Sequence, residues 1–265
     1  MSSRYYDTPY GKLPSVTTVL SIIDKPALLR WVAKEAREAT IKAVWGMIVD
    51  AWQGGFDLGN FDYKKLYETI SHAVNEYQRK QKTALDIGSF VHNCIECWYK
   101  LWEGSRVEYF AFIQEYYPNH PNAVYMLHAY FDCLRIHNIK VTTSEMTVWS
   151  NKGYAVTLDL IAEISGIMAV GDIKTTKKIK PTKKALKENP YLVLFYFDQW
   201  LQLEAYLRAA IFMKLISGIS KKFIIRLDKE NPGTFEYQLR DSSNEDFEAF
   251  VAAMILWKRS KNEKV

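Results

Sequence analysis

The hydrophobic pattern changes its period near Lys140, and this change limits the folds open to the chain. From there on, apolar residues alternate with polar ones as they do in β-strands. Three such segments follow one another, at residues 141–150, 154–164 and 167–175. The turns between them, of which the second is Ser165-Gly166, are short enough to join only antiparallel neighbours. An antiparallel meander of three strands is therefore predicted.

The rest of the chain shows mainly helical periodicity. Before the meander it predicts helices at 16–23, from Pro26 toward Trp45, and at 63–81, 88–102 and 124–136. After the meander it predicts a helix at 195–216, strands at 222–227 and 234–239, and a last helix capped near Ser243. We expect an α/β fold in which a central mixed sheet is flanked by helices and preceded by a helical N-terminal extension. The length fits a single domain over residues 1–265, mainly helical at 1–137 and with its sheet core at 138–265.

Composition narrows the class of protein only a little. The net charge of +5 and the pI near 8.8 would help binding to a polyanion without requiring it. Three cysteines are too few for a disulfide framework, which favours a reducing, cytoplasmic setting. The N-terminus has no signal-peptide pattern, and no apolar run approaches the length of a membrane span. The pair Cys94 and Cys97 has no second pair, so we interpret it as core rather than as a zinc or redox site.

Two carboxylates and a lysine in the meander carry the chemical signal. Asp172 and Lys174 are two residues apart, so their side chains project from the same face of a strand. Counting outward from the Ser165-Gly166 turn places Asp159 directly opposite Asp172. Like charges so placed, with Cβ atoms roughly 4.5 to 5.5 Å apart, destabilise a sheet unless a cation lies between them. The pattern therefore predicts a site for a hard divalent cation such as Mg²⁺.

A metal at this place would suit hydrolysis of a phosphodiester. It would acidify a water molecule and polarise the phosphate, while Lys174 would stabilise the growing negative charge or orient the nucleophile. The alternative is an ordinary Asp-Lys ion pair on a solvated sheet face, which is the commoner explanation of Asp-x-Lys alone. The facing carboxylate of Asp159, within the apolar strand segment Leu158–Ile161, favours the metal site.

An ordered series of motifs resembles the PD-(D/E)XK nuclease superfamily, in particular its RecB-like exonuclease branch. That branch includes the CRISPR-associated and the mitochondrial genome maintenance exonucleases. The matching residues are Gly88 to His92 for Gly-x-x-x-His, Glu145 for an acidic residue in the preceding strand, Asp159, Asp172 to Thr175 for Asp-Ile-Lys-Thr, and Gln202 with Tyr206 for Gln-x-x-x-Tyr. The resemblance runs from about Pro14 to Trp257, and the order of the motifs is more specific than any one of them.

The resemblance implies a restriction-endonuclease-like core and a single nuclease domain acting as a metal-dependent DNA exonuclease. It implies Mg²⁺ or Mn²⁺ held by His92, Asp159 and Asp172. The catalytic set that it implies is Asp159, Asp172, Lys174, Gln202, Tyr206 and Glu145. Glu145 has a rival in Glu163, which is on the same strand face as Asp159. Taken singly, His92, Gln202 and Tyr206 would be ordinary residues of buried helices.

The implied partner is DNA with a free end, single-stranded at the site, in replication, recombination or repair, and the source could be a virus or phage. A lysine-rich segment after the third strand suits contacts with the phosphate backbone, although such a run is more often a solvated loop. Its residues are Lys177, Lys178, Lys180, Lys183 and Lys184. Some aromatic residues of the helical half could stack on unpaired bases, namely Trp45, Trp52, Tyr63, Tyr67 and Tyr77, but we expect most of these five to lie in the core.

The sequence departs from the family pattern in one respect. Some members of the branch bind an iron–sulfur cluster through one early and three late cysteines, whereas here no cysteine follows Cys133, so no such cluster is expected. Two alternative functions stay open at this point: a structure-specific endonuclease on the same fold, and a non-catalytic DNA-binding subunit that has kept the fold. The complete set of acidic residues and lysine argues against the second.

Overall fold

A computed structural model of the protein describes residues 4–23, 26–53, 64, 67, 68, 71, 76–179, 187, 188 and 193–262. The chain forms two compact units, one made of residues 1–23 and 87–265 and the other of residues 24–86. The smaller unit contains α2 (Pro26–Gln53) and the first part of α4 (Glu76–Lys100). Trp45, Trp52 and Tyr67 are exposed there, so the expectation that most of the five aromatic residues lie in the core was wrong. The Tyr63 and Tyr77 side chains lie outside the described part.

The larger unit is built on a five-stranded mixed sheet. Its strands are β3 (Ile139–Ser150), β4 (Tyr154–Ile164), β5 (Ile167–Thr175), β6 (Ser220–Leu227) and β7 (Phe235–Asp241), which lie side by side in that order. Neighbours are antiparallel except for β5 and β6, which are parallel. Ser165 and Gly166 both have positive φ, and Ile164 pairs with Ile167, as a two-residue hairpin requires. The predicted α/β fold and meander are confirmed.

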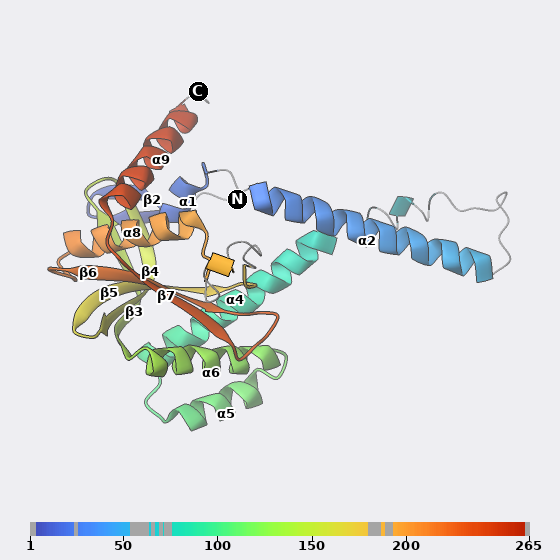
Figure 1. The fold of residues 1–265 in the computed structure, drawn as a ribbon, viewed down its shortest axis with the longest axis horizontal. Helices are drawn as coiled ribbons and strands as arrows, with labels where there is room; N and C mark the ends of the chain where they lie inside the picture. Colours follow the sequence, from blue (N-terminus) through green and yellow to red (C-terminus); the bar gives the residue numbers. More distant parts are fainter. Residues whose placement is uncertain are drawn as a thin grey trace. The chain divides into compact units, whose positions relative to one another are not determined.

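Helices cover both faces of this sheet. On one face lie α1 (Val16–Leu20), α8 (Phe197–Phe212) and α9 (Asn244–Asn262), which share one apolar cluster with the strands. On the other face, α5 (Arg106–Tyr116), α6 (Pro121–Ile136) and the part of α4 from Ile87 onward share a second cluster. Figure 1 shows α8 and the pair α5 and α6 on opposite sides of the strands. No described helix is both long enough and apolar enough to span a membrane.

Several predicted boundaries in the first half were wrong. The segment before Ser15 forms a hairpin of β1 (Tyr5–Thr8) and β2 (Gly11–Pro14), where no strand was predicted. The helix at 88–102 is the second half of one continuous helix, α4. Gly88 was taken as a helix start, but it is an interior position where another side chain comes close. Helix α6 begins at Pro121, because proline suits the first turn of a helix.

Helix α5 was missed altogether. Its signal was present, since Ser105 and Glu108 form a reciprocal capping box: the Ser105 Oγ accepts the Glu108 N–H, and the Glu108 carboxylate accepts the Ser105 N–H. The helix lies outside α6 and buries only Tyr109 and Ile113. Its weak apolar stripe explains why periodicity alone did not reveal it.

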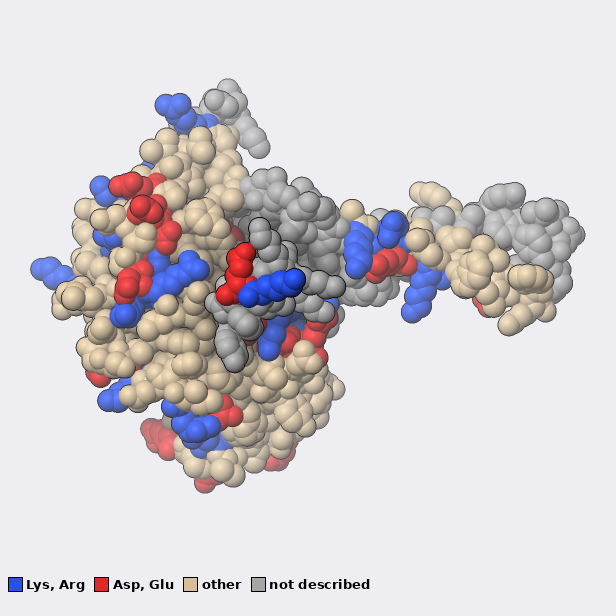
Figure 2. Space-filling model, in the orientation of Figure 1, with Lys and Arg blue, Asp and Glu red and all other residues tan. Residues whose placement is uncertain are grey.

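Charged residues of both signs are scattered over the face of the larger unit that Figure 2 shows. On the face drawn in Figure 2, Lys and Arg side chains lie interspersed with Asp and Glu side chains among the described residues. The net charge of +5 is therefore not gathered in one broad basic surface on this face. Any affinity for a polyanion on this face would have to come from local groups of lysines.

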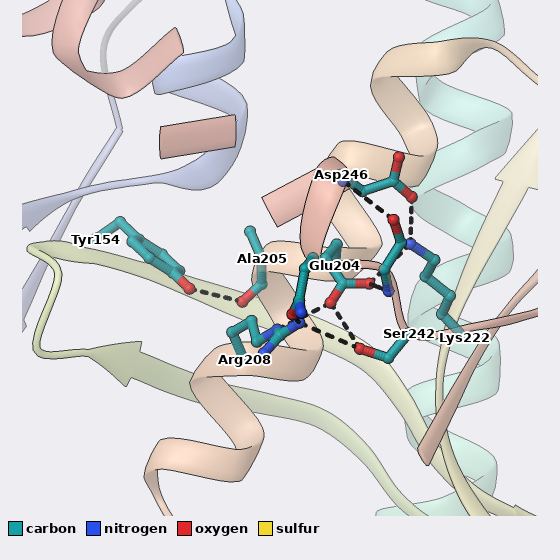
Figure 3. Close-up of polar contacts among 9 residues, drawn as sticks. Tyr154, Glu204, Ala205, Arg208, Lys222, Ser242 and Asp246 are labelled. Atoms are coloured by element: carbon teal, nitrogen blue, oxygen red, sulfur yellow. Dashed lines mark hydrogen bonds and ion pairs between the residues drawn. The ribbon is translucent and has the colours of Figure 1, made fainter. Parts of the chain in front are cut away.

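A buried ion network fixes α8 against β6 and α9 (Figure 3). Lys222 of β6 donates to Glu204 of α8 over 2.7 Å and also to Asp246 of α9. The Glu204 carboxylate also accepts from Arg208 Nε at 2.9 Å, from Ser242 Oγ at 2.8 Å and from the Ser243 N–H at 3.0 Å. Lys222 and Glu204 are both fully buried. The network therefore sets the position of α8, two residues away from Gln202.

Candidate metal centre and active site

Strands β4 and β5 separate just where the candidate residues begin. Their ladder ends at the pair Leu160 and Gly171, so the predicted direct pairing of Asp159 with Asp172 is not formed. The Asp159 Oδ2 instead accepts the N–H of Ile173 at 2.7 Å. Strand β5 continues along β6, and a Cβ atom at Gly171 would lie 2.1 Å from the Phe223 ring. The Phe223 ring therefore occupies the space that a side chain at position 171 would need, and glycine lets it pack over β5.

The face of the sheet to which alternate side chains of β4 point also changes at Asp159. Val156 and Leu158 belong to the cluster that α1, α8 and α9 cover, whereas Leu160 and Ala162 belong to the cluster beneath α4 and α6. A regular strand would keep all four on one face, because its side chains alternate. Asp159 therefore lies at the point where the strand rotates, and its carboxylate is not held in the flat ladder.

Gly88 lets α4 approach the end of β5. A Cβ atom at Gly88 would lie 2.7 Å from Thr175 Oγ1, which is closer than side chains can pack. His92, one helical turn further on, reaches the same region: its Nε2 lies 3.1 Å from the Ile173 carbonyl oxygen. A carbonyl can only accept, so Nε2 carries a hydrogen and, in the neutral ring, Nδ1 is the atom free to bind a metal. In Gly-x-x-x-His, the glycine thus allows α4 to pack close to β5, and the histidine offers a nitrogen that could bind a metal.

His92 Nδ1 points at two carboxylates. It lies 3.5 Å from Glu145 Oε1 and 3.8 Å from Asp159 Oδ2. One ligand atom from each of these three residues lies within 4.8 Å of the other two. Among the described residues this is the group of histidine and acidic side chains that could hold a metal ion.

Glu145 adopts a backbone conformation that is unusual for its residue type. Its φ is +47°, in the left-handed region that non-glycine residues seldom occupy, and its carbonyl oxygen accepts Lys100 Nζ at 3.0 Å. Backbone strain of this kind is found most often at functional sites. Its rival Glu163 is half-exposed near Lys140, with an N–O distance of 3.8 Å. The structure thus brings Glu145, and not Glu163, beside His92.

Asp172 and Lys174 form the second half of the site. Lys174 Nζ lies 2.9 Å from Asp172 Oδ1 and 2.7 Å from Oδ2. Gln202 Nε2 on α8 donates to Asp172 Oδ1 at 3.1 Å and also to the Tyr206 hydroxyl oxygen. Both hydrogens of the Gln202 amide are therefore used, and the Tyr206 hydroxyl keeps its own hydrogen for another acceptor. The spacing of four places both side chains on one face of α8, as predicted.

The charged groups of the site shift one another's pKa values. Burial opposes protonation of His92, but Glu145, Asp159 and Asp172 outweigh it and raise its pKa to about 9. Burial raises the pKa of Asp172 to about 6, against the lowering effect of Lys174. Burial would lower the pKa of Lys174, but Asp172 and Asp159 raise it overall, so the ammonium is charged at neutral pH. Burial, followed by the two aspartates, holds the pKa of Tyr206 well above its ordinary value.

The donor set can hold a divalent cation. The two carboxylates are ligands that Mg²⁺ and Mn²⁺ prefer, whereas an imidazole nitrogen is the more usual ligand of less hard transition-metal ions, and the three groups leave positions for water and substrate oxygens. The two carboxylates repel each other at this separation unless a positive charge lies between them; without metal the protonated His92 ring supplies that charge, and a bound cation would take its place. Within the described residues, Asp172 Oδ2 accepts no well-aligned hydrogen bond, although Lys174 Nζ is near it.

The lysine-rich segment is described in part. Lys177 forms an ion pair with Glu230. Burial would raise the pKa of Asp228, but hydrogen bonds from Asn231 and the Glu230 N–H, and then the charge of Lys178, lower it overall. Lys180, Lys183 and Lys184 lie outside the described residues. Sequence reasoning missed two residues that contact the site strands: Lys100, whose spacing of four from Glu96 was a helical signal, and Tyr6.

Two of the three cysteines are core residues. Cys94 and Cys133 are buried in the cluster beneath α4 and α6, where burial raises the pKa of each thiol to about 12. Such thiols are un-ionised and unreactive at neutral pH. The interpretation of Cys94 as a core residue agrees with this placement.

Comparison with solved structures gives two distant likenesses that can be described. No family model matches the sequence, and no curated protein matches it. An alkaline exonuclease from Laribacter hongkongensis is similar to the chain with a TM-score of 0.36 and 9% identity, over 64% of this chain and 87% of that one. A protein from Eubacterium rectale, provisionally assigned as an exonuclease, is similar with a TM-score of 0.43 and 16% identity, over 69% of each chain.

Proposed function

We propose that the protein is a divalent-metal-dependent nuclease that hydrolyses phosphodiester bonds in DNA, acting from a free end. The observation that carries the proposal is the convergence of His92, Glu145 and Asp159 within 4.8 Å of one another. The Ile173 backbone connects this group to the Asp172–Lys174 pair, because Ile173 binds both His92 and Asp159. Cleavage from an end, and the RecB-like branch, rest on the motif resemblance.

The proposed chemistry divides the residues into two groups. His92, Glu145 and Asp159 would hold Mg²⁺ or Mn²⁺, with Asp172 close to them. When bound, the ion would polarise the phosphate and lower the pKa of the attacking water. Lys174 would stabilise the negative charge that grows on the phosphate, since its ammonium is charged and Asp172 holds it in place.

Helix α8 would orient the second group. Gln202 steadies the Asp172 carboxylate and leaves Tyr206 able to donate its own hydrogen to a phosphate oxygen or a water molecule. Lys177 and Lys178 directly follow the strand that carries Lys174 and would contact the backbone of the strand being cleaved. These contacts are sequence-independent, as a nuclease acting along a chain requires.

Two DNA substrates test the proposal. The protein is incubated with end-labelled linear single-stranded DNA and with closed circular single-stranded DNA, each with Mg²⁺, with Mn²⁺ or with a chelator. We expect metal-dependent degradation of the linear strand and an intact circle. Cutting of the circle would instead show an endonuclease. Binding of both DNAs without cleavage under any metal condition would contradict the proposal and favour a binding subunit.

A further inference from the structure

The N-terminal hairpin lies along the part of β4 that β5 leaves uncovered. Strand β5 pairs with β4 only from Leu160 to Ile164, while β3 pairs with β4 along the other edge as far as Tyr154. Both strands of the hairpin contact β4, and Ser15, just after the hairpin, forms a parallel bridge with Ala155. The hairpin and the residue after it therefore occupy the place that a neighbouring strand would fill.

Tyr6 makes the contact nearest to the metal centre. Its hydroxyl oxygen accepts the backbone N–H of Thr157 at 3.1 Å and lies 3.2 Å from Thr157 Oγ1. Thr157 is two residues before Asp159 on the same strand, at the point where β4 has lost β5. A side-chain hydroxyl thus satisfies a backbone donor that a sheet neighbour would otherwise take.

Arg4, just before the hairpin, holds the Tyr6 ring in place. The Arg4 guanidinium lies over the ring, 4.8 Å from its centre. Arg4 is itself anchored, since its carbonyl oxygen accepts the Ser15 N–H at 2.8 Å and its N–H donates to Thr18 Oγ1 at 3.0 Å. Ser15 also caps α1, whose Val16 and Val19 are fully buried in the core. A chain of contacts therefore runs from the core through Arg4 and Tyr6 to β4.

We propose that Tyr6 is a positioning residue for the metal centre, and that the hairpin braces β4 so that Asp159 stays beside His92 and the Ile173 N–H. The carboxylate of Asp159 is held outside the β4–β5 ladder, so its place depends on where the β4 backbone lies. Tyr6 fixes that backbone two residues away. The effect on metal binding rests on the proposed function, whereas the bracing of β4 does not.

The test compares Tyr6→Phe with Tyr5→Phe. Both variants remove one hydroxyl from β1, but the Tyr5 side chain is 41% exposed, and within the described residues its hydroxyl makes no hydrogen bond. Hydrogen exchange of the Thr157 amide is measured first. In Tyr6→Phe we expect exchange about 3- to 10-fold faster, the size of one lost hydrogen bond, and no change in Tyr5→Phe.

Metal binding is the second measurement, by calorimetry with Mn²⁺ alone and no DNA. We expect the Kd of Tyr6→Phe to rise by roughly 3- to 10-fold, with the KM for DNA unchanged, because the lost contact acts on Asp159 and not on substrate. Equal behaviour of the two variants in exchange and in Mn²⁺ affinity would overturn the proposal. A higher KM for DNA with unchanged Mn²⁺ affinity would also overturn it, since Tyr6 would then be a substrate contact.

Two further outcomes are informative. If Tyr6→Phe does not fold, the Thr157 amide is measured in the unchanged protein, where exchange as fast as that of a free chain would exclude the brace. If the unchanged protein binds no Mn²⁺, the proposed nuclease function fails and so does the role of Tyr6 in metal binding. The exchange comparison still decides whether Tyr6 braces β4.

Discussion

At the scale of single residues, the proposal gives two neighbouring lysines different tasks. Lys174 is paired with the buried Asp172, while Lys177 forms an exposed ion pair with Glu230. Lys174→Ala should lower kcat by about 100- to 1,000-fold, the effect of removing one group that stabilises transition-state charge, and leave most DNA affinity. Circular dichroism checks that the variant is folded. A kcat within a few-fold of that of the unchanged protein would refute the role given to Lys174.

Lys177→Ala is the matched control. It should leave kcat unchanged at saturating DNA and weaken binding in a salt-dependent way. The slope of log affinity for a single strand against log salt should fall in magnitude by about 0.7, the value of one phosphate contact. Fluorescence anisotropy with labelled single-stranded DNA at several salt concentrations measures it. An unchanged slope would show that Lys177 does not touch the phosphate backbone.

The raised pKa of His92 predicts that metal binding releases a proton. Its pKa is about 9 without metal, so the ring is protonated at pH 7, but only the neutral ring binds a metal. Metal binding at pH 7 should therefore release roughly one proton, and affinity should rise with pH until about pH 9. Calorimetry of Mn²⁺ in buffers with different ionisation enthalpies counts the protons. Equal release by His92→Gln would exclude His92 as their source.

Sequence reasoning predicted contacts between candidate residues within one strand, but not their arrangement across two strands. Alternation along β5 correctly predicted that Asp172 and Lys174 are neighbours, because β5 is a regular strand there. The same counting failed across the hairpin, since it assumed a ladder that continues to Asp159. The rotation of β4 and the positive φ of Glu145 depend on contacts with distant segments, including Lys100, that a local pattern does not contain.

At the scale of elements, the crossing of α4 over β5 depends on Gly88. Gly88→Ala should place a methyl group against Thr175 and shift α4, so that His92 moves from the carboxylates. We expect overpacking to cost about 1 to 3 kcal/mol, against a gain of up to about 1 kcal/mol from the better helix propensity of alanine. The two effects on the free energy of unfolding partly cancel. The loss of Mn²⁺ affinity should therefore be easier to detect than the loss of stability.

Two further variants make the Gly88 test specific. Gly46, within α2, has open space where a Cβ would stand, so Gly46→Ala should be neutral or stabilising and should not change Mn²⁺ affinity. Adding Thr175→Ala to Gly88→Ala removes the atom that the new methyl group would meet, and should restore metal binding. Failure of this double variant to recover would show that the crossing is not limited by Thr175.

At the scale of the whole molecule, the fold class could be predicted from the sequence, but the contacts between segments far apart in the sequence could not. The meander, α8 and the last helix follow from period and turn residues, which are local properties. The N-terminal hairpin has few apolar residues and is stable only because it lies against β4, so its sequence did not reveal it. The partners of Lys222 likewise come from α8 and α9, and no spacing in the sequence connects them.

The Glu204–Lys222 network should govern stability in acid. Burial would raise the pKa of Glu204, but Lys222, the Ser243 N–H and Ser242 outweigh it, so the folded pKa lies below the ordinary value. A lowered pKa means that Glu204 contributes stability above its unfolded pKa of about 4.3, and that this contribution is lost as the pH falls through the lower folded pKa.

Glu204→Gln leaves the buried Lys222 with Asp246 alone, so the free energy of unfolding at pH 7 should fall by about 3 kcal/mol. Urea unfolding measures it at pH 7 and again at about pH 3, below the unfolded pKa, where the difference from the unchanged protein should shrink. Glu163→Gln, which removes a half-exposed partner of Lys140, is the control and should cost less than about 0.5 kcal/mol at both pH values. A difference for Glu204→Gln that stays constant with pH would mean that the carboxylate charge does not hold α8 to β6.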